Sequence, residues 1–132
     1  MKELLNNYID WLKQKFTFTQ IGEWCEITTP FVNIHNDQIQ IYAKNDKDTI
    51  TLTDGGYTLN ELELHGIEIE ASKKSRNDLY VILNRFGVKY NNGILSVVAN
   101  NKTFPHVMHR FIQAILSVND MVQLADHISG II

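Results

Sequence analysis

The sequence contains very little cysteine and proline. Cys25 is the only cysteine among 132 residues, so an intramolecular disulfide and a multi-cysteine zinc site are both excluded. Two prolines, 44% hydrophobic residues and 20% charged residues are typical of a globular chain and not of a disordered one. A chain of this length forms one domain with its own hydrophobic core. We therefore predict a single domain over residues 1–132.

The sequence also lacks a basic excess and a long apolar run. Twelve Lys and Arg stand against fifteen Asp and Glu, which gives a net charge of -3 and argues against a nucleic-acid partner. No uncharged apolar run approaches the roughly 20 residues that span a bilayer. Residues 1–7 lead into an amphipathic pattern and not into the apolar core of a signal peptide. These absences predict a cytoplasmic protein without membrane contact.

Hydrophobic periodicity in the first half predicts one helix followed by a meander. Apolar residues at three-and-four spacing predict a helix that ends near Lys15 and packs on the rest of the domain. Short β-rich runs then predict three or four antiparallel strands, joined by turn-forming Asn and Asp residues. These runs cover residues 24–29, 32–34, 38–43 and 49–53.

Two further helices are predicted in the middle of the chain. Thr58 and Glu61 have the spacing of a capping box, in which the Thr hydroxyl and the Glu carboxylate each bond a free backbone amide. This helix is expected to end at Gly66. A longer helix is expected to begin at Ser75 as its N-cap and to end at Gly87.

The last part of the chain predicts a hairpin and a C-terminal helix. Asn91-Asn92-Gly93 supplies the positive φ angles of a tight hairpin turn. An apolar stripe from 104 to 116 has helical spacing, and residues 119–128 extend it, either continuously or after a kink. The expected fold is therefore α+β, with the order α-β-β-β-α-α-β-β-α and helices packed on one face of an antiparallel sheet.

The junction between the meander and the next helix has two interpretations. Asp54 ends a strand and is followed by Gly55 and Gly56. An Asp beside two glycines serves either to hold a sharp turn or to hold a ligand. The sequence leaves both interpretations open.

An acidic constellation raises the question of metal-dependent catalysis. The element order resembles that of restriction-type nucleases, in which an Asp and an acid-x-Lys motif hold a divalent ion. Asp37, Asp54 and Lys44 fit that resemblance, but Tyr42 stands where it requires an acid. Because this departure removes a metal ligand, we predict no catalytic residues and no metal, and keep a degenerate or active nuclease-like enzyme as the alternative.

A basic cluster precedes the predicted second helix of the middle region. Lys73, Lys74 and Arg76 lie where free helix amides and cations could together seat an anion. The alternative is a solvated loop followed by an ordinary N-cap. An anion site here would lose affinity steeply with salt.

The remaining nucleophiles and histidines have no catalytic pattern. No Gly-x-Ser-x-Gly elbow is present, and Cys25 lies in a predicted strand. His106 and His109 could share a helix face as metal ligands, but a site needs further ligands. The other histidines are expected at the surface or at helix ends; they are His35, His65 and His127.

Three segments, read in order, resemble one bacterial and phage family. These are residues 29–31, 36–42 and 53–59. Together they are similar to the family catalogued as domain of unknown function eighteen-twenty-eight, mainly up to the helix that ends at Gly66. The resemblance implies a gene of Gram-positive bacteria, their phages or mobile elements, and no established activity. The element order also resembles type III secretion chaperones, which dimerise and bind an extended partner.

The sequence therefore predicts a non-catalytic protein-interaction domain without a cofactor. Its expected partner is a host protein, such as a defence or DNA-processing factor, and the expected contacts are Asp37, Tyr42, Asp54 and Tyr57. A secretion-chaperone-like dimeric module is a further alternative. A homodimer formed through the C-terminal helix is also compatible with its apolar stripe.

Overall fold

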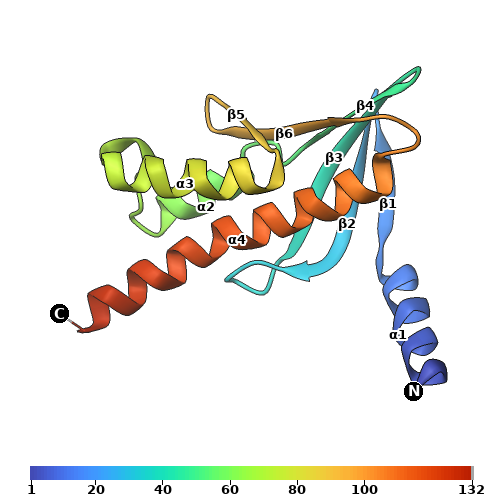
Figure 1. Cartoon of the computed structure of the whole chain (residues 1–132), viewed down its shortest axis with the longest axis horizontal. Coiled ribbons are helices and arrows are strands. Elements are labelled where there is room, and N and C mark those ends of the chain that lie inside the picture. Colours follow the sequence, from blue (N-terminus) through green and yellow to red (C-terminus); the bar gives the residue numbers. More distant parts are fainter. Residues whose placement is uncertain (132) are drawn as a thin grey trace.

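The computed structural model describes residues 1–131, with side chains described for residues 1–121. Six strands form one antiparallel sheet in the order β1-β2-β3-β4-β6-β5, and α2, α3 and α4 pack on one of its faces (Figure 1). In chain order the elements are α1 (Lys2–Lys15), β1 (Thr17–Ile21), β2 (Trp24–Val32), β3 (Gln38–Asp46), β4 (Thr49–Thr53), α2 (Tyr57–Leu64), a 3-10 turn η1 (Ile69–Ala71), α3 (Lys73–Phe86), β5 (Lys89–Asn91), β6 (Ile94–Ala99) and α4 (Phe104–Ile131). The α+β prediction is confirmed.

Alternation along the central strands separates a covered face from an open one. In β3, Ile39 and Ile41 are buried against the helices, whereas Gln38 and Gln40 are exposed. The pairing of Tyr42 with Thr53 carries this alternation into β4, where Ile50 and Leu52 are buried. We call the uncovered side, which carries the side chains alternating with the buried ones, the outer face.

The meander has four strands, as the sequence allowed, but they are not the four predicted runs: β1 is additional, and the runs at 24–29 and 32–34 form one strand. β1 was missed because all five of its residues are exposed, so no buried face gives it a clear pattern. Residues on both sides of Pro30 belong to the single strand β2, which shifts register between Thr28 and Val32. The buried Thr29 hydroxyl donates to the Ile39 carbonyl at 2.9 Å, which helps to hold this irregular segment in the sheet.

The long helix α4 supplies much of the core. It is one continuous helix, Phe104–Ile131, which is the first of the two possibilities that the sequence left open. Its inward residues are packed against the sheet and against α2 and α3; the buried apolar ones are Met108, Phe111, Ile112, Ala114, Ile115 and Val118. Because this stripe is already covered within one chain, these residues are not available for the homodimer predicted through the C-terminal helix. In the part of the chain with described structure, no helix is long and apolar enough to cross a membrane.

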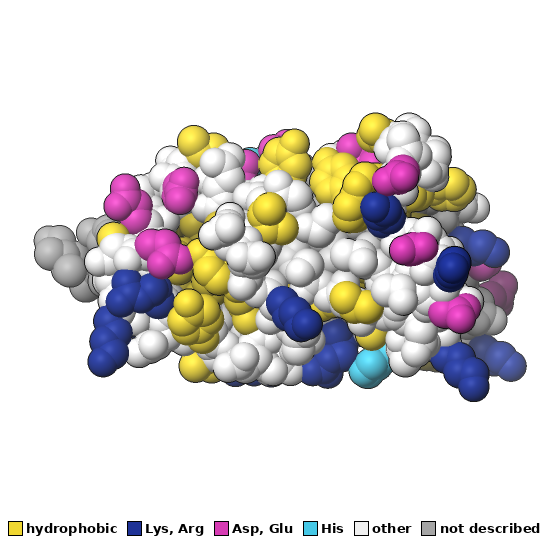
Figure 2. Space-filling model, turned by 90° about the horizontal axis from the view of Figure 1, so that it is seen from above, with side chains coloured by type: hydrophobic (Ala, Val, Ile, Leu, Met, Phe, Trp, Pro, Cys, Tyr) yellow, Lys and Arg dark blue, Asp and Glu magenta, His cyan; other side chains and the backbone are white. Residues whose placement is uncertain are grey.

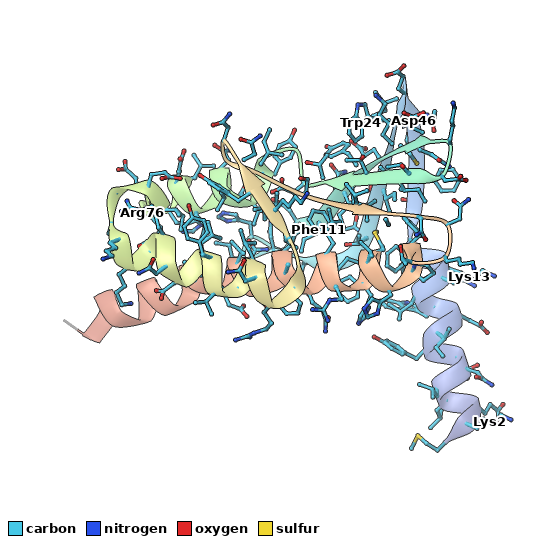
Figure 3. All side chains as sticks on the ribbon, turned by 45° about the horizontal axis from the view of Figure 1, so that its top comes forward. Lys2, Lys13, Trp24, Asp46, Arg76 and Phe111 are labelled. Carbon is cyan, nitrogen blue, oxygen red and sulfur yellow. The ribbon has the colours of Figure 1, made fainter. Side chains whose placement is uncertain are left out.

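The prediction that α1 packs on the domain is wrong. None of its residues is buried, and it extends from the start of β1 away from the other layers (Figures 1 and 3). Its end is anchored by Phe16, whose ring lies edge-on to Phe31 with centroids 6.2 Å apart. The helix itself leaves a large apolar face in water.

Candidate functional site

Asp54 holds the junction between β4, β6 and α2. One carboxylate oxygen accepts from the Gly56 amide at 2.9 Å and from the Leu95 amide at 3.0 Å. The other accepts from the Thr58 amide at 3.1 Å, and the side chain is 1% exposed. Asp54 therefore satisfies two amides at the start of α2 and one amide of β6, which is a structural role.

The capping box predicted at Thr58 and Glu61 is wrong. The helix begins one residue earlier than Thr58, its N-cap is Gly56, and Thr58 is buried in the first turn. Gly55 and Gly56 have φ angles of +68° and +85°, so they turn the chain back toward Asp54. The carboxylate of Asp54, and not the Thr58 hydroxyl, accepts hydrogen bonds from the amides at the start of the helix.

Tyr57 is the point at which the predicted contact residues meet. It stacks on Tyr42, with ring centroids 6.4 Å apart and planes 27° from parallel. It also lines two hollows, a polar one that includes Asp37 and Asp54 and an aromatic one that includes Tyr42. The structure thus brings all four predicted residues to one region, although it gives Asp54 a different task.

The aromatic hollow lies on the outer face and has a volume of about 390 Å³. It is lined by Ile21, Trp24, Tyr42, Gly55 and Tyr57. A Cβ atom added at Gly55 would lie 3.2 Å from the Tyr42 ring, so glycine allows the two tyrosines to approach the junction.

Charged side chains border the aromatic hollow. Lys44 lies over the Trp24 ring, 5.8 Å from its centroid, and its ammonium group is 3.2 Å from the Glu23 carboxylate. Burial, followed by the nearby Glu26 carboxylate, raises the pKa of Tyr42 to about 12. Tyr42 therefore remains a neutral ring and hydroxyl at ordinary pH.

Two tyrosines, Tyr42 and Tyr90, are expected to lose their hydroxyl protons at a higher pH than usual. A hydrogen bond to Glu70, and then burial, raises the pKa of Tyr90 to about 12, as for Tyr42. The unfolded chain releases these protons at about pH 10. Stability from both groups is therefore complete below pH 10 and is lost as pH rises toward 12. Tyrosinate absorbance of the wild type should include a late component near pH 12, and this component should be smaller in Tyr42→Phe and in Tyr90→Phe. A late component that neither substitution reduces would contradict this assignment.

The polar hollow lies between the β2–β3 turn, α2 and α4 and has a volume of about 250 Å³. Asp37 and Glu61 contribute carboxylates to its lining, and Asn33 and Asn119 contribute amides. Among the side chains that the structure describes, no group of three or more His, Cys, Asp and Glu is arranged to hold a metal ion.

Beside the polar hollow lies a histidine cluster that the sequence did not predict. Nε2 of His35 is 2.9 Å from Nε2 of His65 and 2.9 Å from Oε2 of Glu61. Nε2 of His35 can form a hydrogen bond with only one of these two neighbours at a time. Oε2 of Glu61 is buried without a well-aligned hydrogen bond. The cluster ties the β2–β3 turn to α2. The four-residue spacing of Glu61 and His65 is visible in the sequence, but His35 joins them only through the fold.

The predicted anion-binding residues do not converge on one point. Arg76 donates to the Glu70 carbonyl at 2.6 Å, and Lys74 lies 3.4 Å from the Asp78 carboxylate. The N-cap of α3 is Ser72, whose hydroxyl accepts from the Ser75 amide, so the prediction of Ser75 as N-cap is wrong. Lys73 is exposed at the first position of the helix. This arrangement agrees with the solvated loop and ordinary cap.

The other predicted histidines add no site. His106 and His109 are both exposed on α4, and the structure describes no third ligand arranged with them for a metal. His127 lies outside the residues whose side chains are described.

Comparison with known proteins identifies a family. Residues 29–118 match the family model described as "Domain of unknown function DUF1828", which extends the similarity well beyond the first half of the chain. No curated protein and no solved structure matches the chain. The match includes the junction at Asp54 and both hollows except for Ile21, Trp24 and Asn119.

Proposed function

We propose that this chain, which belongs to the DUF1828 family, is a non-catalytic protein-interaction domain. Its partner is a host protein, a defence or DNA-processing factor, that a phage or mobile element modulates through it. The observation that carries the proposal is the aromatic hollow formed by Trp24, Tyr42 and Tyr57 on the outer face.

The composition of the hollow is that of a protein-binding hot spot. Trp and Tyr dominate such sites because they bury a large area at a small cost in side-chain entropy. Tyr57 is 58% exposed, and its stacking on Tyr42 limits the motion of both rings before a partner arrives. On the face drawn in Figure 2, hydrophobic side chains lie among charged and other polar groups. The hollow gathers three aromatic residues from three different elements, Trp24, Tyr42 and Tyr57.

The polar groups near the hollow support binding over catalysis. Asp54, the carboxylate that a nuclease mechanism would need, is buried and already accepts three backbone hydrogen bonds. A metal ion at Asp54 would have to replace these bonds and leave amides of α2 and β6 unpaired.

Affinity capture with matched variants tests the proposal. Tagged wild-type protein should retain a specific host protein from a lysate of the cells in which the gene is found. Trp24→Ala and Tyr57→Ala should each reduce the retained amount by about tenfold or more, because a central aromatic contact contributes about 2 kcal/mol or more. Tyr80→Ala removes a tyrosine of similar exposure on α3 and should retain the same amount as the wild type.

Two outcomes of the capture would reject the proposal. One is the reproducible recovery of the bait alone. The other is a partner that all three variants retain equally.

A further inference from the structure

We propose that the segment formed by α1 and β1 pairs with the same segment of a second copy of this chain. The segment covers residues 2–21 and lies before the family match, which begins at residue 29. This dimer surface shares Ile21 with the aromatic hollow and does not include the C-terminal helix.

The first observation is that α1 is a helix without a packing partner. It has 14 residues, none of them buried, and its main contact with the rest of the domain is with β2. Isolated helices shorter than about 12–15 residues are marginal in water, because helices in proteins gain most of their stability from packing. A second surface is therefore needed to cover the apolar side of α1.

The second observation is the size of the exposed apolar area. Seven large side chains of the segment are between 49% and 76% exposed; they are Leu4, Leu5, Tyr8, Ile9, Trp11, Phe18 and Ile21. Each half-exposed large side chain presents on the order of 100 Å², so the seven together present roughly 700–800 Å² of apolar surface. A standard interface buries about 800 Å² on each partner, so one such segment has the area for a stable contact.

The third observation concerns charge on α1. At about 100° of rotation per residue, Glu3 and Asp10 project from the side opposite to Leu5, Tyr8 and Leu12. Two α1 helices can therefore bring their apolar sides together without burying a carboxylate. Tyr8 and Trp11 already stack on this side, with ring centroids 6.4 Å apart.

The fourth observation favours a second copy as the occupant. β1 lies at the edge of the sheet, all five of its residues are exposed, and it contains neither a charged residue nor proline. Edge strands usually carry such residues to prevent pairing with another chain. A twofold axis that runs along the segment sets α1 against α1 and β1 beside β1, and it closes the assembly at two copies.

Sedimentation equilibrium of the full chain tests the dimer. Between about 1 and 100 µM the wild type should approach twice its mass of 15.2 kDa, which corresponds to a dissociation constant in the micromolar range. Tyr8→Glu in α1 and Phe18→Lys in β1 should each weaken dimerisation by about 100-fold. Both side chains are exposed in one copy, so cooperative urea unfolding of the core should be retained. Val81→Glu, at an exposed apolar position of α3, should dimerise as the wild type does.

Three results would overturn the inference. A wild type that remains monomeric at 100 µM would show that no second copy binds. A dimer that persists in Tyr8→Glu or in Phe18→Lys, or one that Val81→Glu also dissociates, would place the contact elsewhere.

Discussion

Replacement of Asp54 by alanine is expected to lower the free energy of unfolding by about 3–4 kcal/mol. The substitution leaves the amides of Gly56, Thr58 and Leu95 without their carboxylate partner; the bonds to Thr58 and Leu95 are buried, and the bond to Gly56 is partly buried. Each unsatisfied buried amide costs about 1–3 kcal/mol, reduced where water enters the space that the carboxylate leaves. Urea unfolding followed by circular dichroism measures the change.

Two comparisons separate the network from the mere loss of a charge. Asp54→Asn keeps one acceptor oxygen and should lose about half as much stability as Asp54→Ala. Asp37→Ala removes an exposed carboxylate from the neighbouring turn and should change stability by less than about 0.5 kcal/mol. An Asp54→Ala protein as stable as the Asp37→Ala protein would refute the structural role of Asp54.

Replacement of Phe111 by alanine is expected to have a similar or larger effect, about 3–5 kcal/mol. Phe111 lies on α4 and is fully buried in the core between the sheet and its layer of helices (Figure 3). Its truncation removes a large apolar contact and leaves a cavity that the surrounding strands and helices cannot fill completely. The same urea titration measures the loss.

The control for Phe111 is an exposed apolar side chain. Leu64 is 71% exposed at the end of α2, and Leu64→Ala should cost less than about 0.5 kcal/mol. Equal losses for Phe111→Ala and Leu64→Ala would contradict the assignment of α4 as the main covering layer of the sheet.

Much of the fold follows from local sequence patterns. The Asn92-Gly93 turn has the two positive φ angles expected of it, and Gly87 ends α3 in the left-handed conformation. The stripe of α4 is buried as its helical spacing predicted. In each case the residues that determine the structure are close together in the chain, so the pattern is complete within a short window.

Two of the errors arose where a contact from elsewhere decides the structure. The Thr58 box has the right spacing, but Asp54 reaches the same amides from outside the helix and also bonds Leu95, which lies 41 residues away. The packing of α1 was predicted from its amphipathic pattern, and the pattern does not say which molecule covers the apolar side.

The sequence predicted four residues of the candidate site but not how they are arranged. Tyr42, Tyr57, Asp37 and Asp54 do meet, because the glycines at 55 and 56 turn α2 back toward β3. Trp24 was missed as part of the site because it comes from β2, and strand register alone does not show which outer-face residue reaches Tyr57. His35 and His65 were missed as neighbours for the same reason.

The central claim is that the aromatic hollow binds a protein partner, and the affinity of the purified partner tests it most directly. Isothermal titration calorimetry should compare the wild type with the double variant Trp24→Ala/Tyr57→Ala and with Tyr80→Ala. The account predicts that the double variant binds at least about 100-fold more weakly, as expected when two hot-spot aromatic residues are lost. It also predicts an unchanged dissociation constant for Tyr80→Ala. A double variant that binds as tightly as the wild type would contradict the account.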